Sequence, residues 1–167
     1  KKKYNKDKKN NILYVANFNY FKNQLYLIFA TLFIKHKVRI NFIYSKKNLY
    51  FLICKYISYF ISSMNKRISF HFHENLNRKS INKFYLKSEI FVSPSKIECA
   101  PLMIADCVTS GLYFISSDVG NVKEIINKFK IGTTYSSFFD LVTKINLNLK
   151  KKIKVRQNKE LDWKKIL

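Results

Sequence analysis

Short apolar runs of strand length alternate along the chain with longer segments whose apolar residues recur at helical spacing. The short runs are rich in β-branched and aromatic residues and predict strands at 11–18, 38–44, 67–73, 89–93, 112–116 and 131–135. The longer segments predict helices at 24–35, 49–64, 77–88, 101–110, 121–129 and 138–149. Asn121 and Glu124 have the spacing of a capping box at the start of one of these helices. Regular alternation of strand and helix predicts a Rossmann-like α/β domain with a mainly parallel sheet and helices on both faces.

The two ends of the chain fall outside this pattern. Residues 1–10, KKKYNKDKKN, are charged rather than apolar, so we expect a basic arm or linker remnant and not a secretory signal. Residues 11–149 form the predicted domain, and 150–167 form a polar tail or docking helix with Trp163 and Ile166 as docking residues. The chain does not begin with Met, and we expect it to be a fragment of a longer protein.

The chain is strongly basic, with 32 Lys and Arg against 10 Asp and Glu and a net charge of +22. Such an excess attracts nucleic acid or anionic membranes. However, 28 of the 32 basic residues are lysine, and the abundant Lys, Asn, Ile, Phe and Tyr all have AT-rich codons. Genome composition therefore explains the charge without a partner. We do not expect nucleic acid, and we keep an anionic membrane surface as a candidate partner.

One stretch combines two acids with the signals of a helix start and end. Glu98 and Asp106 lie eight residues apart, on either side of Pro101, in the run SPSKIECAPLMIADCVTSG. Pro101 suits the first turn of a helix, and Gly111 suits the left-handed position after its end. The N-terminus of such a helix favours an anion such as a diphosphate. A carboxylate nearby accepts hydrogen bonds from vicinal sugar hydroxyls, although acids are also common near helix starts as simple surface residues.

Three other groups of residues are weaker candidates. His71 and His73 share one strand face, but no ligand spacing completes a metal site around them. Cys99 lies in the acid-bearing stretch without a histidine tied to it by sequence, as a nucleophile requires. Aromatic residues and lysine interleave between Tyr50 and Tyr59, as in a stacking platform for single-stranded nucleic acid. Packing against a core explains these aromatic residues more simply. The three cysteines form no disulfide spacing and favour a reducing compartment.

The run SPSKIECAPLMIADCVTSGLYFISSDVGNVKEII resembles the signature region of family-four retaining glycosyltransferases with the GT-B fold. That signature has Pro-Ser, a Glu, seven residues, a second Glu, a helix end with small residues, a strand, and a turn like Ser-Asp-x-Gly-Gly before Glu-Ile. The opening run ILYVANFNYFKNQLYLIFA is similar to the start of the C-terminal domain in this family. The resemblance covers roughly residues 11–149 and implies the donor-binding half of a GT-B enzyme.

The resemblance also implies roles for individual residues. Glu98 matches the acid that contacts the donor sugar, and Lys22 matches the lysine that neutralises the donor diphosphate, so both are the expected catalytic residues. Asp106 matches the acid that holds the ribose hydroxyls. The backbone around Ala100 and Leu102 matches the loop that approaches the sugar and phosphate.

The chain differs from the family pattern at three places in this expected donor site. Asn17 stands where the family has an arginine, five residues before the lysine. Asp106 replaces a Glu and is shorter by about 1.5 Å. Cys99, Ala100 and Pro101 replace a Gly-aromatic-Gly sequence, and Pro101 has no N–H to offer.

We therefore expect a nucleotide-sugar-binding domain of a hexosyltransferase-type enzyme that acts in cell-surface polysaccharide synthesis. The expected partners are a nucleotide-sugar donor and a glycan or lipid-linked acceptor, the latter held by an N-terminal domain that this chain lacks. We expect no metal cofactor, a cytoplasmic location extending to the inner face of the membrane, and no activity of this chain alone. Two alternatives stay open: a non-catalytic remnant of the fold, and a basic module that binds nucleic acid or anionic membrane.

Overall fold

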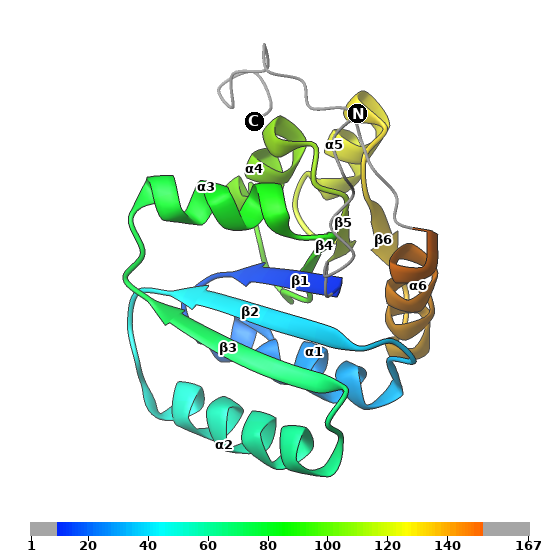
Figure 1. Ribbon diagram of the computed structural model, residues 1–167. Coiled ribbons are helices and arrows are strands. Elements are labelled where there is room, and N and C mark those ends of the chain that lie inside the picture. Colours follow the sequence, from blue (N-terminus) through cyan, green and yellow to red (C-terminus); the bar gives the residue numbers. More distant parts are fainter. Residues whose placement is uncertain (1–9, 152–167) are drawn as a thin grey trace, which may run out of the picture.

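The computed structural model describes residues 10–151 as one α/β domain (Figure 1). Six strands and six α-helices alternate along this part of the chain, with two short 3-10 helices. The strands are β1 (Asn10–Val15), β2 (Val38–Tyr44), β3 (Ile68–Glu74), β4 (Ile90–Ser93), β5 (Phe114–Ser117) and β6 (Thr133–Tyr135). The helices are η1 (Tyr20–Lys22), α1 (Gln24–Ala30), η2 (Thr31–Phe33), α2 (Leu49–Met64), α3 (Arg78–Lys87), α4 (Leu102–Ser110), α5 (Val122–Phe129) and α6 (Phe138–Lys151).

All strand pairs are parallel, and the sheet order is β3-β2-β1-β4-β5-β6. The chain therefore builds outward from β1 in one direction, returns, and builds outward from β4 in the other. The order reverses between β1 and β4, where Ile12 and Leu13 pair with Ile90 and Phe91. In open parallel sheets, such a reversal leaves a crevice beyond the carboxyl ends of the two strands, and ligands bind there.

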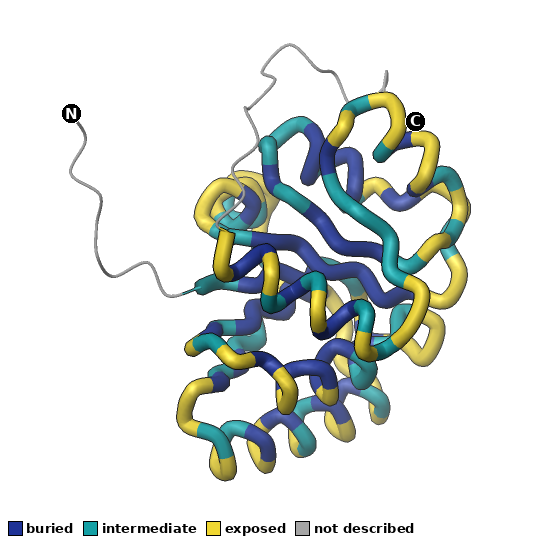
Figure 2. Tube along the Cα trace, turned by 90° about the vertical axis from the view of Figure 1, so that its right-hand side faces the viewer, coloured by how far each residue is buried: buried dark blue, intermediate teal, exposed yellow. Residues whose placement is uncertain are grey.

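The strands are apolar on both faces because helices cover both faces. In β1, Ile12 and Tyr14 pack into one core with α1, α2 and α6. Leu13 points the other way, into a second core with α3, α4 and α5. Figure 1 shows α3, α4 and α5 above the sheet, with α1 and α2 below it. Figure 2 shows the buried strands between the two helical layers.

Asparagine side chains begin several of the helical segments. Asn19, Asn48 and Asn77 each adopt extended backbone and accept a hydrogen bond from an amide two or three residues later. This bond satisfies one of the amides that the first helical turn leaves free. Asn48 also donates to the carbonyl of Phe18, at 2.7 Å. It therefore links the start of α2 to the loop after β1.

The fold class is confirmed, and the sheet is entirely parallel within residues 10–151. The predicted strand 38–44 and helix 49–64 match β2 and α2 in their bounds. The predicted helix 24–35 is wrong beyond Ala30, because the Thr31 hydroxyl donates to the carbonyl of Ile28 and the chain tightens into η2. The predicted arm 1–10 and tail 150–167 lie outside the described residues except at their inner ends.

Two predictions about helix starts are corrected. The capping box at Asn121 and Glu124 is wrong, because Asn121 has φ −91° and ψ 20° and makes no side-chain capping bond. Its backbone lacks the extended conformation from which a capping side chain reaches the amides of the first turn. Pro101 precedes α4 as its N-cap rather than lying inside the first turn, since its ψ of 98° is extended. Gly111 ends α4 in the left-handed region, as predicted. No helix within residues 10–151 is long and apolar enough to cross a membrane.

Replacing Asn48 with alanine tests the capping interaction. Asn48→Ala removes the cap of α2, where Asn48 Oδ1 accepts from the Phe51 amide at 2.8 Å, and also the bond to Phe18. We expect a loss of about 1–2 kcal/mol in the free energy of unfolding, measured by urea denaturation. Asn82→Ala, at an exposed position on α3, is the control and should leave stability unchanged or slightly raised. Equal effects of the two substitutions would contradict the capping role.

Candidate functional site

The loops that leave β1 and β4 meet at the carboxyl edge of the sheet, where the strand order reverses. The amide of Lys96 in the second loop donates to the carbonyl of Phe21 in the first, at 2.7 Å. The Lys96 ammonium also lies 3.6 Å from the centre of the Tyr20 ring, at cation–π distance. These contacts hold η1 and the loop 94–101 against one another across the crevice.

Lys22 and Glu98 form an ion pair between these two loops, although 76 residues separate them in sequence. The Lys22 Nζ to Glu98 Oε1 distance is 2.5 Å, and the side chains are 28% and 11% exposed. The Tyr14 hydroxyl donates to the backbone carbonyl of Lys22 at 2.8 Å and so fixes the backbone from which the Lys22 side chain extends. Burial, and then the charge of Glu98, raise the pKa of Tyr14 well above its usual value. Tyr14 therefore stays protonated as a donor.

Gly120 sets the position of the loop that carries Glu98. It lies in the turn between β5 and α5, with φ +55°. A Cβ atom on Gly120 would lie 2.6 Å from the backbone carbonyl oxygen of Glu98 and would also collide with that of Cys99. Only glycine allows both this backbone conformation and this close approach. The Ser117 hydroxyl supports the same loop by donating to the carbonyl of Ser95.

Asp106 lies on α4 and is bound by an arginine of the neighbouring helix, α3. Arg78, the first residue of α3, donates to both oxygens of Asp106, with 2.8 Å between Nη1 and Oδ2. The hydrogen bond to Asp106 raises the pKa of Arg78. A carboxylate has about four acceptor positions, so two remain after a bidentate arginine. Asp106 can therefore be oriented by Arg78 and still accept hydrogen bonds from a ligand.

Two small cavities lie between α3, α4 and the ends of β1 and β2. The first, of about 240 Å³, is lined by Arg78, Leu102, Ala105 and Asp106. The second, of about 230 Å³, is largely apolar and lies beside Asn17, Tyr44 and Met103. No side chain caps the N-terminus of α4, and its first turn contains no acid. This end of α4 therefore offers free amides and a positive dipole to an anion.

The structure brings together most of the residues that the sequence selected for the site. Lys22 contacts Glu98, while Leu102 and Asp106 share one cavity. Ala100 is exposed in the loop between Glu98 and α4. Asn17 lines the neighbouring cavity, and its Oδ1 accepts from the amides of Ser45 and Lys46 at 2.8 and 3.1 Å.

Arg78, Gly120 and Tyr14 are additional site residues that the sequence analysis did not select. Arg78 is one of four arginines in this lysine-rich chain, and no local pattern distinguishes it from the other three. Gly120 stands in the glycine turn of the signature run, and only the fold shows what it touches.

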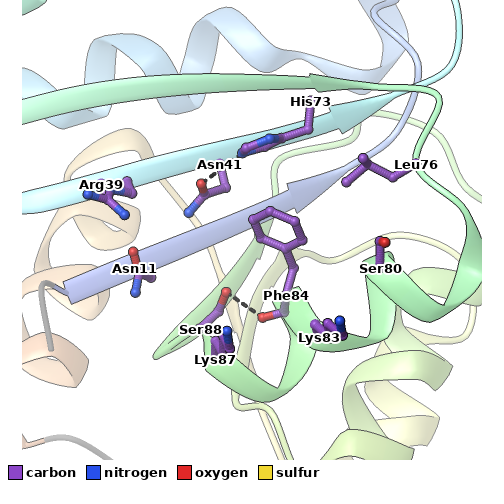
Figure 3. Close-up of a pocket in the computed structure, with 10 residues that line it drawn as sticks. All are labelled: Asn11, Arg39, Asn41, His73, Leu76, Ser80, Lys83, Phe84, Lys87 and Ser88. Carbon is purple, nitrogen blue, oxygen red and sulfur yellow. Dashed lines mark hydrogen bonds between the residues drawn. The ribbon is translucent and has the colours of Figure 1, made fainter. Parts of the chain in front are cut away.

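A further cavity, of about 400 Å³, lies elsewhere, between α3 and the face of β1, β2 and β3 (Figure 3). His73, Asn41, Phe84 and Arg39 line it together with lysines of α3. His73 bonds Asn41 at 3.1 Å, and the rings of His71 and His73 stack. Within residues 10–151, no group of three or more His, Cys, Asp or Glu side chains is placed to hold a metal ion. The cavity is separate from the Lys22–Glu98 crevice.

The ionisation of His73 tests the burial of this cavity between α3 and the sheet. Burial first, and then His71 and Arg39, lower the pKa of His73 below its ordinary value of 6.5. Below pH 6.5, His73 binds a proton in the unfolded chain but still resists protonation in the folded protein. The folded protein therefore loses stability as the pH falls from 6.5 through the folded pKa of His73. We expect acidification from neutral pH to destabilise the wild type more than His73→Gln, as measured by thermal unfolding. NMR titration should show the folded pKa directly, and identical pH dependence of the two proteins would contradict this environment.

Comparisons with known proteins agree with the α/β fold and with the family that the signature run around Glu98 and Asp106 resembles. The family described as "Glycosyl transferases group 1" matches residues 1–164, nearly the whole chain. Sucrose-phosphate synthase from Thermosynechococcus elongatus superposes with a TM-score of 0.75 and 16% identity, over 95% of this chain and 40% of that one. The catalytic domain of cholesterol-alpha-glucosyltransferase from Helicobacter pylori superposes with a TM-score of 0.70 and 16% identity, over 86% and 87% of the two chains.

A third similar structure is WaaG, a glycosyltransferase involved in lipopolysaccharide biosynthesis, with a TM-score of 0.70 and 16% identity. The matched regions cover 87% of this chain and 39% of WaaG. The chain thus spans about two fifths of the length of WaaG and of the synthase. None of the curated protein sequences matches the chain. The structural matches at this identity show the fold, and the family match over residues 1–164 shows the membership. The chain therefore belongs to the group 1 glycosyl transferases and has the Rossmann-like fold of a GT-B domain.

Proposed function

We propose that this chain is the donor-binding domain of a retaining glycosyltransferase that transfers a sugar from a nucleotide diphosphate to a glycan or lipid-linked acceptor. The ion pair between Lys22 and Glu98, at the reversal of strand order, is the observation that carries the proposal. It places one cation and one carboxylate side by side in the crevice where open parallel sheets bind ligands. The family uses nucleotide-sugar donors, and cell-surface polysaccharide synthesis is the proposed setting.

In the proposed complex, the diphosphate lies between Lys22 and the N-terminus of α4. The ammonium of Lys22 has three donors, and Glu98 uses one of them. When the bond between the sugar and the diphosphate breaks, negative charge grows on the leaving oxygen, and a fixed ammonium stabilises it. Glu98 is paired through Oε1, and its remaining acceptor positions can accept hydrogen bonds from sugar hydroxyls. Ala100 and Leu102, both exposed, follow Glu98 along the chain and lead into the start of α4.

The nucleoside extends from the diphosphate toward α3. Asp106 accepts the ribose hydroxyls at the two positions that Arg78 leaves open. The base occupies the apolar cavity beside Met103 and Asn17, where Asn17 offers its amide NH₂ as a donor. The acceptor is held by a further domain, consistent with a chain that spans about two fifths of WaaG. We therefore expect donor binding without sugar transfer from these 167 residues alone.

Protection of Cys99 from alkylation tests donor binding. Cys99 is exposed and adjoins Glu98, while Cys54 and Cys107 are buried. Burial raises the pKa of Cys54 to about 12 and that of Cys107 well above its usual value, so both are unreactive. We expect UDP- or GDP-sugars at millimolar concentration to slow alkylation of Cys99, measured by mass spectrometry.

Variants of the two acids show whether the protection comes from the proposed contacts. Glu98→Gln and Asp106→Asn should each lower the affinity for the protecting nucleotide sugar by roughly tenfold or more, because each removes a charged hydrogen-bond acceptor. Each variant is compared with its own rate without ligand, because Glu98 adjoins the cysteine. The control is Asp140→Asn on α6, an acid that forms an ion pair with Lys144 one helical turn away. Absence of protection in the wild type would favour the non-catalytic remnant over this proposal.

Adding a methyl group at Gly120 tests the positioning of the Glu98 loop. Gly120→Ala strains a backbone at φ +55° and pushes a Cβ atom into the carbonyl of Glu98. We expect a loss of about 1–3 kcal/mol in stability and a roughly tenfold or greater loss of donor affinity. Gly111→Ala introduces similar backbone strain at φ +66°, at the far end of α4. It should cost stability but keep donor affinity, so equal loss of affinity in both variants would contradict the role of Gly120.

A further inference from the structure

Helix α2 is apolar on two opposite faces. Its inner face packs Phe51, Cys54 and Ile61 into the core with α1 and the sheet. Its outer face carries large apolar side chains at helical spacing that are 44% to 75% exposed, namely Leu49, Leu52, Ile53, Tyr56, Phe60 and Met64. We call these six residues the α2 stripe. α2 is the lowest helix in Figure 1, and exposed positions recur along the bottom of Figure 2.

The α2 stripe is larger than folding of this domain requires. A helix of 16 residues is about 24 Å long, and the stripe runs over its whole length. Scattered apolar residues are normal on a surface, but a continuous apolar face indicates contact with a partner or a membrane. The solvent-facing side of α2 is mostly apolar, although solvent favours polar side chains there.

The charges around the stripe indicate which kind of surface it meets. Residues 46–67 contain five basic residues and no acid. Lys46 precedes α2, Lys66 and Arg67 follow it, and Lys55 lies within it, with its ammonium 5.5 Å from the Tyr59 ring centre. Lys47 is paired with Glu74 at 2.5 Å. An apolar helix face flanked by cations binds the interface of an anionic bilayer. A second copy of a chain with net charge +22 would be repelled.

We propose that the α2 stripe docks on the surface of an anionic lipid bilayer, with its apolar side chains in the interface and Lys46, Lys55 and Lys66 against the headgroups. The docking is carried by α2 and its flanking lysines and does not depend on donor binding. One consequence does rest on the proposed function. The amides of Ser45 and Lys46, just before α2, bond Asn17 at the carboxyl edge of the sheet. Docking therefore brings that edge near the membrane and leaves α4, on the opposite face, uncovered.

Sedimentation of the full chain with vesicles tests the proposal. The probes are vesicles of phosphatidylcholine alone and vesicles in which about one third of the lipid is phosphatidylglycerol. We expect the wild type to bind the anionic vesicles at least roughly tenfold more tightly, with binding falling as salt rises. The triple variant Ile53→Gln, Tyr56→Gln, Phe60→Gln should lose roughly tenfold or more in binding. Lys46→Gln with Lys55→Gln and Lys66→Gln should reduce binding to anionic vesicles without replacing any apolar side chain.

The control for lost apolar surface is Leu86→Gln with Leu147→Gln, on α3 and α6, where both leucines are exposed. It should bind vesicles as the wild type does, and circular dichroism should show that every variant is folded. Equal binding of the wild type and the α2 triple variant would overturn the proposal. The proposal would also be overturned if analytical ultracentrifugation showed a dimeric wild type and a monomeric triple variant, and neither protein bound vesicles. Failure of Cys99 protection would leave the vesicle result standing, because no substituted residue lies in the donor crevice.

Discussion

The reversal of strand order between β1 and β4 is the constraint on which the site depends. Chain segments on either side of this point turn away in opposite directions, so only loops close the carboxyl edge of the sheet there. The Lys22–Glu98 pair joins those loops, and the bond between Lys96 and Phe21 fixes their backbones. Gly120 supports the same loop from the side of β5. Three segments far apart in sequence thus meet at one place because the sheet is doubly wound around it.

The sequence predicts the elements well where one local pattern decides them. The strand 38–44 and the helix 49–64 match because each is a long apolar segment whose composition and periodicity fit only one type of element. The errors occur where tertiary contacts decide. The Thr31 hydroxyl ends α1 early by bonding Ile28, and the turn at Gly120 leaves Asn121 in a conformation that cannot cap α5. Periodicity contains neither piece of information.

The site shows the same division between local and long-range information. The spacing of Glu98 and Asp106 is local, and the sequence contains it. The family resemblance placed Lys22 and Glu98 in one expected donor site, but their ion pair across 76 residues was not predicted, because no periodicity connects them. The contact between Arg78 and Asp106 depends on how α3 lies against α4. That alignment comes from the packing of the second core, and the sequence gives no measure of it.

The departures from the family pattern become intelligible as a set once the contacts are known. Asn17, in place of an arginine, binds the amides of Ser45 and Lys46 and so supports the loop after β2 rather than adding a phosphate cation. Pro101 lacks an N–H, but its carbonyl accepts from Ile104 and begins α4. In the proposed donor complex, neutralising the diphosphate therefore falls mainly to Lys22, which is already paired with Glu98. The donor shares its principal cation with an internal carboxylate whose negative charge offsets part of the charge of Lys22, so the ion pair that shapes the site also limits its affinity for the donor.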